Sequence, residues 1–326
     1  MKLHQIKAFL AVSQAGSLKT AAEQLHLTQP ALSKAIKELE QQYGVALFER
    51  SASGLTLTPY GERLLGYARM MNETARRAKQ DIDTMRGISS CLVTVGVTPI
   101  ASLIKSLTTS LNEFMRRHPE VTLRIVELRP APLLEQIRQG GVDFAITSQI
   151  PVIDSALDWQ AICRIPNVVV TRKSHPLCNT RSLRALHQSE WVTLDAPDDP
   201  NTYHYQLFAV NGLPIPSRIR ECTSMTLARS LIQTADLAAL FSTESLELDY
   251  IKNEFAVVPL LDNIPDSVIS VVRPKRDIMT QSAMELFERI LQDMRDIYPE
   301  FQSRRSGGKV IRNKKRASVC RPFCFV

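Results

Sequence analysis

The 326-residue sequence lacks several features that mark whole classes of protein. No apolar run approaches the ~18–20 residues that cross a bilayer, so a membrane-spanning protein is not expected. The first residues, MKLHQIKAFLAVSQAG, imitate a secretory signal only weakly, because the apolar stretch is short and interrupted by polar residues. The sequence therefore favours a cytoplasmic location.

Cysteine-based sites and common enzyme motifs are also missing. The six cysteines are scattered, with no C-x-x-C pair and no histidine cluster beside them, which favours reduced thiols over a zinc site or disulfides. The sequence contains no G-x-S-x-G, H-E-x-x-H or G-x-x-x-x-G-K motif. We therefore do not expect an enzyme, and we expect neither a cofactor nor a metal.

The formal net charge of +7 is unevenly distributed. Residues 302–326 hold eight Lys or Arg and no acidic residue, whereas residues 88–301 hold 20 basic and 25 acidic residues. The basic character of the chain thus comes from its last segment and does not by itself indicate nucleic-acid binding. Residues 1–87, with 12 basic and 8 acidic side chains, are modestly basic, which is compatible with binding a phosphate backbone.

The first sixty residues carry the signals of short helices. Leu3, Ile6 and Phe9 recur at helical spacing before Gly16, and Ser17 is placed to cap a second helix. The segment LTQPALSKAIKELEQQYG then opens a third helix near residue 29. Its threonine hydroxyl can accept a hydrogen bond from a first-turn amide, and its proline lacks only an amide that would have no helical partner there.

The third helix has two contrasting faces. Its predicted buried stripe consists of Leu32, Ala35, Ile36 and Leu39. The opposite face presents Gln29, Ser33 and Lys37, with Lys34 beside them. Glutamine can pair with adenine, serine with several base edges, and lysine with guanine or phosphate. With the following VALFER and a turn at SASG, this plan predicts a winged helix-turn-helix, although helix spacing alone fits a solvated amphipathic helix equally well.

The run AAEQLHLTQPALSKAIKELEQQYGVALFER, followed by GLTLTPYGERLL, resembles the N-terminal domain of LysR-type transcriptional regulators. The resemblance implies base-edge contacts at or near Gln29, Pro30 and Ser33, and phosphate contacts for Lys34 and Arg50. Family members usually carry basic residues just after this arginine, whereas this sequence has Ser51, Ala52 and Ser53. The expected DNA-binding residues are Thr28, Gln29, Pro30, Ser33, Lys34, Lys37 and Arg50.

A long helix is predicted from Pro59, capped by Thr58, to Gly87. Apolar or small residues recur along it at alternating spacings of four and three: Leu64, Ala68, Met71, Ala75, Ala78, Ile82 and Met85. This heptad spacing favours a coiled coil over a helix that lies on its own domain, and the helix would be about 40 Å long. We expect a homodimer through residues 59–86 that binds inverted-repeat DNA sites, and we expect dimers to pair into a homotetramer.

From Cys91 onward, strand and helix signals alternate. The strands VTVGV, VTLRIVEL and FAIT, with a helix from Ile100 to Arg117 and another at PLLEQIRQG, give a βαβαβ order and imply a parallel sheet covered by helices. A second set of strands and helices follows, and SVISVVRP with a final helix returns at the end. The LysR resemblance implies a two-lobed effector domain like that of periplasmic binding proteins.

The expected fold is α/β with four parts. Residues 1–58 form the winged helix-turn-helix, 59–87 the linker and dimerisation helix, 88–301 the two-lobed effector domain, and 302–326 a basic, disordered tail. Lobe 1 would comprise about 88–165 and 266–301, and lobe 2 about 166–265. The tail either adds a nonspecific DNA-binding arm or is an extension without function.

Ligands of open parallel sheets bind beyond the carboxyl ends of the strands. Arg129 stands at such an end and would favour an anion. The expected effector-binding residues are Thr98, Ser102, Arg129, Thr147, Ser148, Tyr203 and Thr223. Each has an alternative explanation, because serines and threonines before helices are first of all caps and most arginines are surface charges.

Together these patterns predict a sequence-specific transcriptional regulator of the LysR type. It would bind double-stranded DNA and be switched by a small, anionic organic effector held between two lobes. Two rival functions stay open on the sequence alone. A two-lobed solute-binding protein would need export, and a structural nucleoid protein would bind DNA without sequence preference or ligand.

Overall fold

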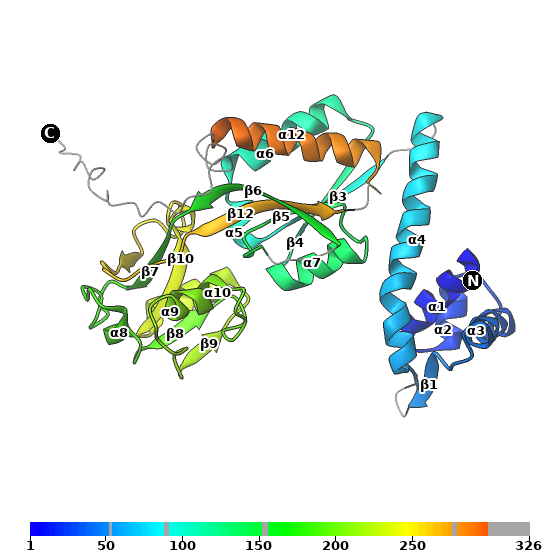
Figure 1. Cartoon of the computed structure of the whole chain (residues 1–326), viewed down its shortest axis with the longest axis horizontal. Coiled ribbons are helices and arrows are strands. Elements are labelled where there is room, and N and C mark those ends of the chain that lie inside the picture. Colours follow the sequence, from blue (N-terminus) through cyan, green and yellow to red (C-terminus); the bar gives the residue numbers. More distant parts are fainter. Residues whose placement is uncertain (52–53, 88–90, 152–155, 276–278, 299–326) are drawn as a thin grey trace.

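The computed structural model describes residues 1–51, 54–87, 91–151, 156–275 and 279–298. Within them the chain forms a small head, a long helix beside it, and two lobes that each contain a sheet (Figure 1). The predicted tail, residues 302–326, lies outside the described residues, as do Ala52 and Ser53 of the wing. None of the described helices is long and apolar enough to cross a membrane.

Three helices and a two-stranded wing form the head: α1 (Leu3–Ala15), α2 (Leu18–Gln24), α3 (Gln29–Tyr43), β1 (Phe48–Ser51) and β2 (Gly54–Leu57). They enclose one hydrophobic cluster, in which Phe9, Leu32 and Leu39 are fully buried. Ala21 and Ala22 are also buried there, and their small side chains let α2 lie close to α1 and α3. The predicted buried stripe of the third helix is thereby confirmed at its aliphatic positions.

Helix α4 (Pro59–Met85) joins the head to the lobes. It begins after Thr58, as predicted, and the Thr58 hydroxyl accepts a hydrogen bond from Gly61 N at 3.2 Å. Ala68 is buried in the head cluster, and Leu64 and Met71 pack against that cluster. These three positions of the predicted heptad seam therefore pack within the chain instead of facing solvent.

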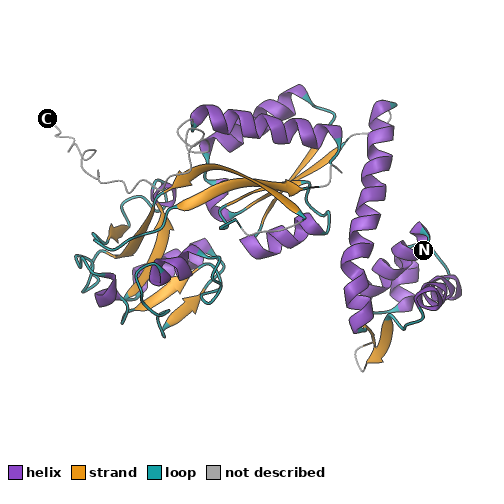
Figure 2. Cartoon of the chain, viewed as in Figure 1, coloured by secondary structure: helices purple, strands orange, loops and turns teal. Residues whose placement is uncertain are grey.

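Lobe 1 contains β3 (Leu92–Val97), β4 (Thr122–Glu127), β5 (Phe144–Thr147), β6 (Leu157–Ile165) and β12 (Ser267–Pro274), with α5 (Pro99–Ser102), α6 (Lys105–Arg117), α7 (Pro130–Arg138) and α12 (Gln281–Ile297). The strand order is β4–β3–β5–β12–β6; β3 runs parallel to β4 and β5, whereas β12 runs antiparallel to β5 and β6. Helices α6 and α12 cover one face and α7 the other, as Figure 2 shows.

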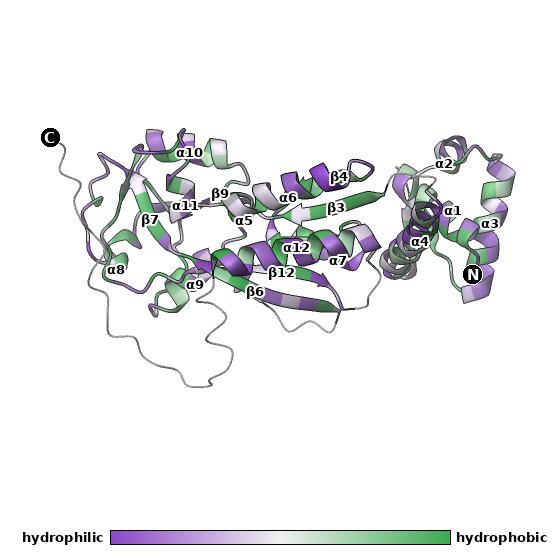
Figure 3. Cartoon of the chain, turned by 90° about the horizontal axis from the view of Figure 1, so that it is seen from above, coloured by the Kyte–Doolittle hydropathy of each residue, from purple (hydrophilic) through white to green (hydrophobic). Residues whose placement is uncertain are grey.

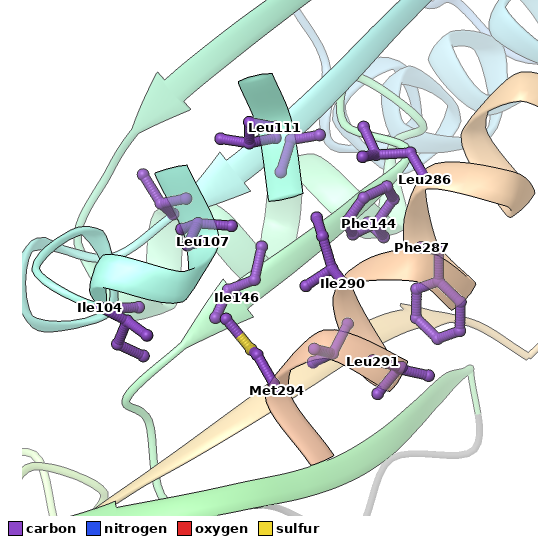
Figure 4. Packing of buried hydrophobic residues seen from close by; sticks show 14 of the residues in the cluster. Ile104, Leu107, Leu111, Phe144, Ile146, Leu286, Phe287, Ile290, Leu291 and Met294 are labelled. Atoms are coloured by element: carbon purple, nitrogen blue, oxygen red, sulfur yellow. The ribbon is translucent and has the colours of Figure 1, made fainter. Parts of the chain in front are cut away.

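The core of lobe 1 lies between its central strands and the α6–α12 pair. Phe144 and Ile146 of β5 point toward Ile290 and Met294 of α12 (Figure 4). The Phe144 ring meets the Phe287 ring edge-on, with centroids 5.5 Å apart. Figure 3 shows β3 and β12 as mostly hydrophobic, because both faces of these central strands are covered by helices.

The single helix predicted from Ile100 to Arg117 is wrong. The structure divides this segment into α5 and α6, because Ile104 adopts an extended conformation (φ −72°, ψ 112°). Its side chain is 2% exposed within the lobe 1 core. Burying the residue interrupts the helix, a tertiary effect that apolar periodicity does not reveal.

Lobe 2 contains β7 (Asn167–Arg172), β8 (Glu190–Thr193), β9 (Ile219–Glu221), β10 (Leu237–Ser242) and β11 (Phe255–Val257), with α8 (Leu183–Leu186), α9 (Tyr203–Ala209), α10 (Met225–Thr234) and α11 (Thr243–Leu246). The strand order is β11–β7–β10–β8–β9, and β8 pairs parallel with β9 and β10. Buried residues of α10 pack on one side of this sheet, and those of α8 and α9 on the other.

Two short crossovers connect the lobes. The chain leaves lobe 1 between Ile165 and Asn167 and re-enters it at Ser267. Asn167 Nδ2 donates hydrogen bonds to Pro265 O at 2.8 Å and to Ser267 Oγ at 2.9 Å. The crossovers therefore lie side by side and are tied together, so that the lobes share one hinge.

Candidate nucleic-acid interface and interlobe cavity

The start of α3 is fixed by its own sequence and by the turn before it. Thr28 Oγ1 accepts a hydrogen bond from Ala31 N at 3.4 Å, and Pro30 occupies the first turn. His26, with φ 53°, takes the left-handed conformation between α2 and α3. The helix therefore begins at a defined place relative to α2, which a base-reading helix requires.

The outer side of α3 is polar. Gln29, Lys34 and Lys37 are exposed, and Ser33 is half-buried. Lys34 forms a 4.0 Å ion pair with Glu38. Within the described part of the chain, Gln29 and Lys37 make no hydrogen bond or ion pair, so both side chains are available to another molecule.

A shallow hollow lies between the start of α2, the start of α3 and the wing. Gln29 and Arg50 line it together with Lys19, a residue that the sequence analysis did not anticipate. At Gly54, with φ 123°, an added Cβ would lie 2.6 Å from Gly16 O, so only glycine lets the wing approach this closely. The side chains of Lys19 and Arg50 thus lie around Gln29 in this hollow. Such an arrangement suits two phosphate contacts beside one base contact.

The second half of α4 packs on lobe 1 through a buried ion pair. Arg77 is 2% exposed and Asp143 is 1% exposed. Arg77 Nη2 lies 3.0 Å from Asp143 Oδ1 and donates a hydrogen bond to Gly140 O at 2.8 Å. Thr94 N donates to Asp143 Oδ2 at 2.7 Å. Burial raises the pKa of Asp143, and the charge of Arg77 opposes that rise.

Beyond this contact, α4 joins lobe 1 once more and then becomes exposed. Gln80 Nε2 donates a hydrogen bond to Leu92 O at 3.1 Å. Ala78, Ile82 and Met85, the last three members of the predicted seam, are exposed, with Ile82 at 58% and Met85 at 85%. Helix α4 thus contacts the head and lobe 1 with one side and leaves apolar residues near its end uncovered.

A cavity of about 160 Å³ lies between the two lobes. Lobe 1 lines it with residues that follow β4 and β5, including Arg129 and Gln149. Lobe 2 lines it with residues that follow β8, including Asp195 and Tyr203. A cavity of about 150 Å³ in another protein holds a benzene molecule, so this interlobe cavity has room for a small organic molecule.

An ion pair connects the two lobes beside the interlobe cavity. Arg129, the N-cap residue of α7 in lobe 1, places Nη1 2.8 Å from Oε1 of Glu221, which ends β9 in lobe 2. The two side chains are 37% and 44% exposed. An ion pair this open to solvent stabilises the contact between the lobes by only about 0–1 kcal/mol, so another anion can replace the glutamate at little cost.

Asp195 is the acidic counterpart of Arg129 inside the interlobe cavity. Burial raises the pKa of Asp195; the positive charge of Arg129 lowers it, and Asp199 and Glu221 raise it further. Among the described residues, the Asp195 carboxylate has no hydrogen-bond partner, although its backbone N–H bonds to Thr193 Oγ1. The interlobe cavity thus offers an acceptor that no side chain of the described residues satisfies.

Two buried polar side chains also line the interlobe cavity without partners in the described residues. Gln149 is 6% exposed, and its Oε1 accepts no hydrogen bond. His204 has no partner at either ring nitrogen, and burial lowers its pKa to about 4, so the ring is neutral near pH 7. Each such buried polar atom costs about 1–3 kcal/mol unless a ligand or water bonds to it.

The structure separates the predicted effector residues into two groups. Arg129, Ser148 and Tyr203 line the interlobe cavity. The four others do not line it: Thr98, Ser102, Thr147 and Thr223. The buried Thr98 lies behind Ser148, with their hydroxyl oxygens 3.2 Å apart, whereas the Thr223 side chain is exposed to solvent.

Several lining residues were missed by the sequence analysis. Asp195 directly follows the predicted strand WVTL, so the strand-end rule could have found it, as it could have found Gln149 after FAIT. His204 carried no such signal, since it lies on α9 and packs edge-on against Trp191 and Phe208. In the described residues, no group of three or more His, Cys, Asp or Glu side chains could hold a metal.

Comparison with known proteins matches both halves of this architecture. The family described as "Bacterial regulatory helix-turn-helix protein, lysR family" matches residues 3–62, and the "LysR substrate binding domain" matches residues 90–295. In Escherichia coli (strain K12), the HTH-type transcriptional regulator YdcI is 32% identical over 236 residues, covering 71% of this chain and 76% of YdcI. TdcA, also an HTH-type transcriptional regulator of that strain, is 27% identical over 295 residues, covering 88% of this chain and 91% of TdcA.

Solved structures share the fold. Full-length CbnR in complex with its target DNA superimposes with a TM-score of 0.64 at 20% identity, covering 90% of this chain and 100% of CbnR. Full-length BenM superimposes with a TM-score of 0.52 at 21% identity, covering 93% of this chain and 98% of BenM. At these identities the likeness shows the arrangement of helices and sheets alone.

Proposed function

Because the chain belongs to the LysR family of bacterial transcriptional regulators, we propose that it reads an inverted-repeat DNA site as a dimer and that an effector in the interlobe cavity changes this reading. As a member of this family, the chain is a DNA-binding transcriptional regulator with an effector-binding domain, not an enzyme. The proposal adds which residues read DNA, how the chains pair, and where the effector sits.

The proposed DNA contacts are carried by the exposed side of α3. Gln29, Pro30 and Ser33 contact base edges, and Lys34, Lys37 and Arg50 contact phosphates. Thr28 holds the helix start in place. The hollow shared by Gln29, Arg50 and Lys19 supports this assignment and adds Lys19 as a phosphate contact.

The proposed dimer uses residues 59–86. Support comes from Ala78, Ile82 and Met85, whose side chains are exposed near the end of α4 and would be buried by a second copy of the helix. A two-fold pair of heads requires inverted half-sites about one helical turn of DNA, or a multiple of it, apart. We also propose that dimers pair into a homotetramer and that the protein acts in the cytoplasm, where it meets the DNA.

The exposed end of the seam can be tested with a matched pair of variants. Ile82→Asp places a charge where the partner helix would pack, and we expect a dimer dissociation constant at least about tenfold higher. Lys79→Asp, one turn earlier and 81% exposed at its side chain, should leave the dimer intact. Analytical ultracentrifugation measures both, and a wild-type chain that sediments as a monomer contradicts the proposed dimer.

The observation that carries the effector proposal is that Arg129 of lobe 1 and Asp195 of lobe 2 line the same cavity. A ligand that touches both lobes binds more tightly when they are closed, and only such a difference in affinity can shift the arrangement. We propose that the effector is a small organic molecule whose anionic group replaces Glu221 at Arg129. Ser148 and Tyr203 complete its polar contacts.

Selection from a random DNA pool tests the DNA-reading proposal directly. The purified full chain should enrich a sequence with two inverted half-sites. A nucleoid protein that binds without preference would enrich none, and that result contradicts the proposal. Repeating the selection with Gln29→Ala identifies which base pair this side chain reads, because the preference should relax at that position alone.

A further inference from the structure

We propose that the effector carries an ammonium group as well as a carboxylate, so that it is a small zwitterion of the amino-acid type bridging Arg129 and Asp195. This inference rests on the proposed effector site between the lobes and names the chemical class of its ligand. It is carried by three features of the interlobe cavity: the placement of its charges, its unsatisfied acceptors and its size.

The charged residues that line the interlobe cavity have opposite signs on opposite lobes. Arg129 projects from lobe 1, whereas Asp195 and Asp199 follow β8 in lobe 2. Asp199 is already engaged within its own loop through one oxygen, since its Oδ1 accepts hydrogen bonds from Asn201 N at 2.9 Å and Asn201 Nδ2 at 3.0 Å. Asp195 is therefore the carboxylate left to meet a ligand.

A simple anion does not fit this charge distribution. Its carboxylate would reach Arg129 but would also face Asp195 and Asp199 across a small, partly desolvated space, where like charges repel strongly. A cationic group on the same ligand removes the repulsion and gives Asp195 a charge-assisted hydrogen bond.

The neutral polar side chains agree with a ligand that donates hydrogen bonds. Gln149 is more than nine-tenths buried, lines the interlobe cavity, and has an Oε1 atom with no donor among the described residues. An ammonium group has three donors, enough to reach Asp195 and a second acceptor of this kind. An ionised carboxylic acid with neither an amine nor a hydroxyl group has no donor for either residue, and a 2-hydroxy acid has a single neutral one.

Size and apolar lining restrict the ligand further. At about 160 Å³, the interlobe cavity is close to the space that holds one benzene ring elsewhere. Ile100 on lobe 1 and Val192, Leu240 and Phe241 on lobe 2 supply an apolar wall. A short aliphatic side chain fits against such a wall, so the class is a compact amino acid and not a nucleotide or an oligosaccharide.

The test compares probes that differ by one charged group. The twenty common amino acids are screened by thermal shift on the full chain. Each one that raises Tm is then compared, by calorimetry, with the 2-hydroxy acid and the amine of the same carbon skeleton. We expect at least one amino acid to bind, and both partners lacking one charge to bind roughly tenfold or more weakly.

Three variants test which residue binds each charged group of the ligand. Asp195→Asn should weaken binding of the amino acid by roughly tenfold or more and abolish its preference over the 2-hydroxy acid. Arg129→Gln should abolish the preference over the amine. Asp198→Asn is the matched control, because this aspartate lies in the same loop, is exposed, and does not line the interlobe cavity.

Three results would overturn the inference: no amino acid raises Tm, the 2-hydroxy acid binds as tightly as the amino acid, or Asp195→Asn behaves like Asp198→Asn. These outcomes are separate from failure of the proposed function. If an organic acid without an amine binds in the interlobe cavity and alters the DNA footprint, the zwitterion inference is wrong while the effector site stands.

Discussion

The head and the interlobe cavity present their functional side chains in opposite ways. Gln29, Lys34 and Lys37 project from one helix into solvent, and within the described residues their one polar contact is the 4.0 Å ion pair of Lys34 with Glu38. In the interlobe cavity, Arg129 is held by Glu221, and the polar groups come from separate segments of both lobes. A rigid local surface suits a target with a repeating backbone, whereas a site divided between two bodies can respond to closure.

Helix α4 connects these two parts of the molecule, because it contacts both the head and lobe 1. Its first half completes the core of the head, and its second half is fixed to lobe 1 by Arg77 and Gln80. A movement of lobe 1 would therefore move α4 and, with it, the head. The largest expected effect on stability comes from removing the buried Arg77–Asp143 ion pair, which joins α4 to lobe 1.

Arg77→Met leaves Asp143 buried without its ion-pair partner. We expect the free energy of unfolding to fall by about 3–5 kcal/mol, the usual effect of removing one member of a buried pair. Urea denaturation of the full chain measures it. Lys79→Met, which removes a 3.8 Å ion pair to Asp83 from an 81% exposed side chain, should cost less than about 0.5 kcal/mol. Equal effects of the two substitutions would show that the buried pair does not join α4 to lobe 1.

Gln29→Ala tests the exposed side of the comparison. Loss of a bidentate base contact should weaken binding to the selected DNA site by about 1–3 kcal/mol, while binding to unrelated DNA stays unchanged. Fluorescence anisotropy with both DNAs measures the ratio. Gln41→Ala, an exposed position near the end of the same helix, is the control. An unchanged specificity ratio for Gln29→Ala contradicts a base-reading role.

The pH dependence of the free energy of unfolding tests the burial of His204 in the interlobe cavity. Its folded-state pKa is lowered by burial to about 4, below the ordinary 6.5, so the unfolded chain takes up a proton first as pH falls. The stability that neutral His204 contributes is therefore complete above pH 6.5 and is lost as pH falls toward 4. The expected loss between pH 7.5 and pH 5 is about 2 kcal/mol.

The variant His204→Gln should remove that part of the pH dependence, measured by urea denaturation at the two pH values. His187→Gln, also in lobe 2, controls for the loss of an imidazole side chain. If wild type and His204→Gln lose stability in parallel on acidification, the histidine is not buried in its neutral form.

The smallest expected effect comes from removing one proposed phosphate contact, that of Lys37. Lys37→Ala should lower the slope of log affinity against log salt by about 1 without changing sequence preference. Arg184→Ala, an exposed cation in lobe 2, should leave the slope unchanged. Binding titrations at several salt concentrations separate the two, and an unaltered slope for Lys37→Ala removes this residue from the DNA contacts.

The sequence predicted the head well because its signals are local. The cap at Thr28, the proline in the first turn and the i, i+4 polar face all lie within ten residues, and the family resemblance drawn from them is confirmed. The two-lobed α/β fold is confirmed as well. The break at Ile104 could not be predicted, since packing in the lobe 1 core imposes it.

The residues that line the interlobe cavity were predicted only in part, because packing between distant segments of the chain decides which residues line it. Arg129 and Ser148 follow strands that the strand-end rule identifies, whereas Tyr203, at the start of α9, was predicted as an aromatic wall. Whether a given strand end faces the other lobe depends on how the two sheets meet across the hinge, which no local pattern specifies. Thr223 stands before a helix of lobe 2 yet is exposed, whereas His204 is buried in the first turn of α9 and lines the interlobe cavity.

The central claim is that a ligand between the lobes changes how the head engages DNA. DNase footprinting of the full chain on its selected site, with and without a saturating ligand found by thermal shift, tests it most directly. We expect the ligand to alter the protected length or the cleavage between half-sites for wild type, and Arg129→Gln to abolish this change. A saturated wild-type protein whose footprint is identical with and without ligand would contradict it.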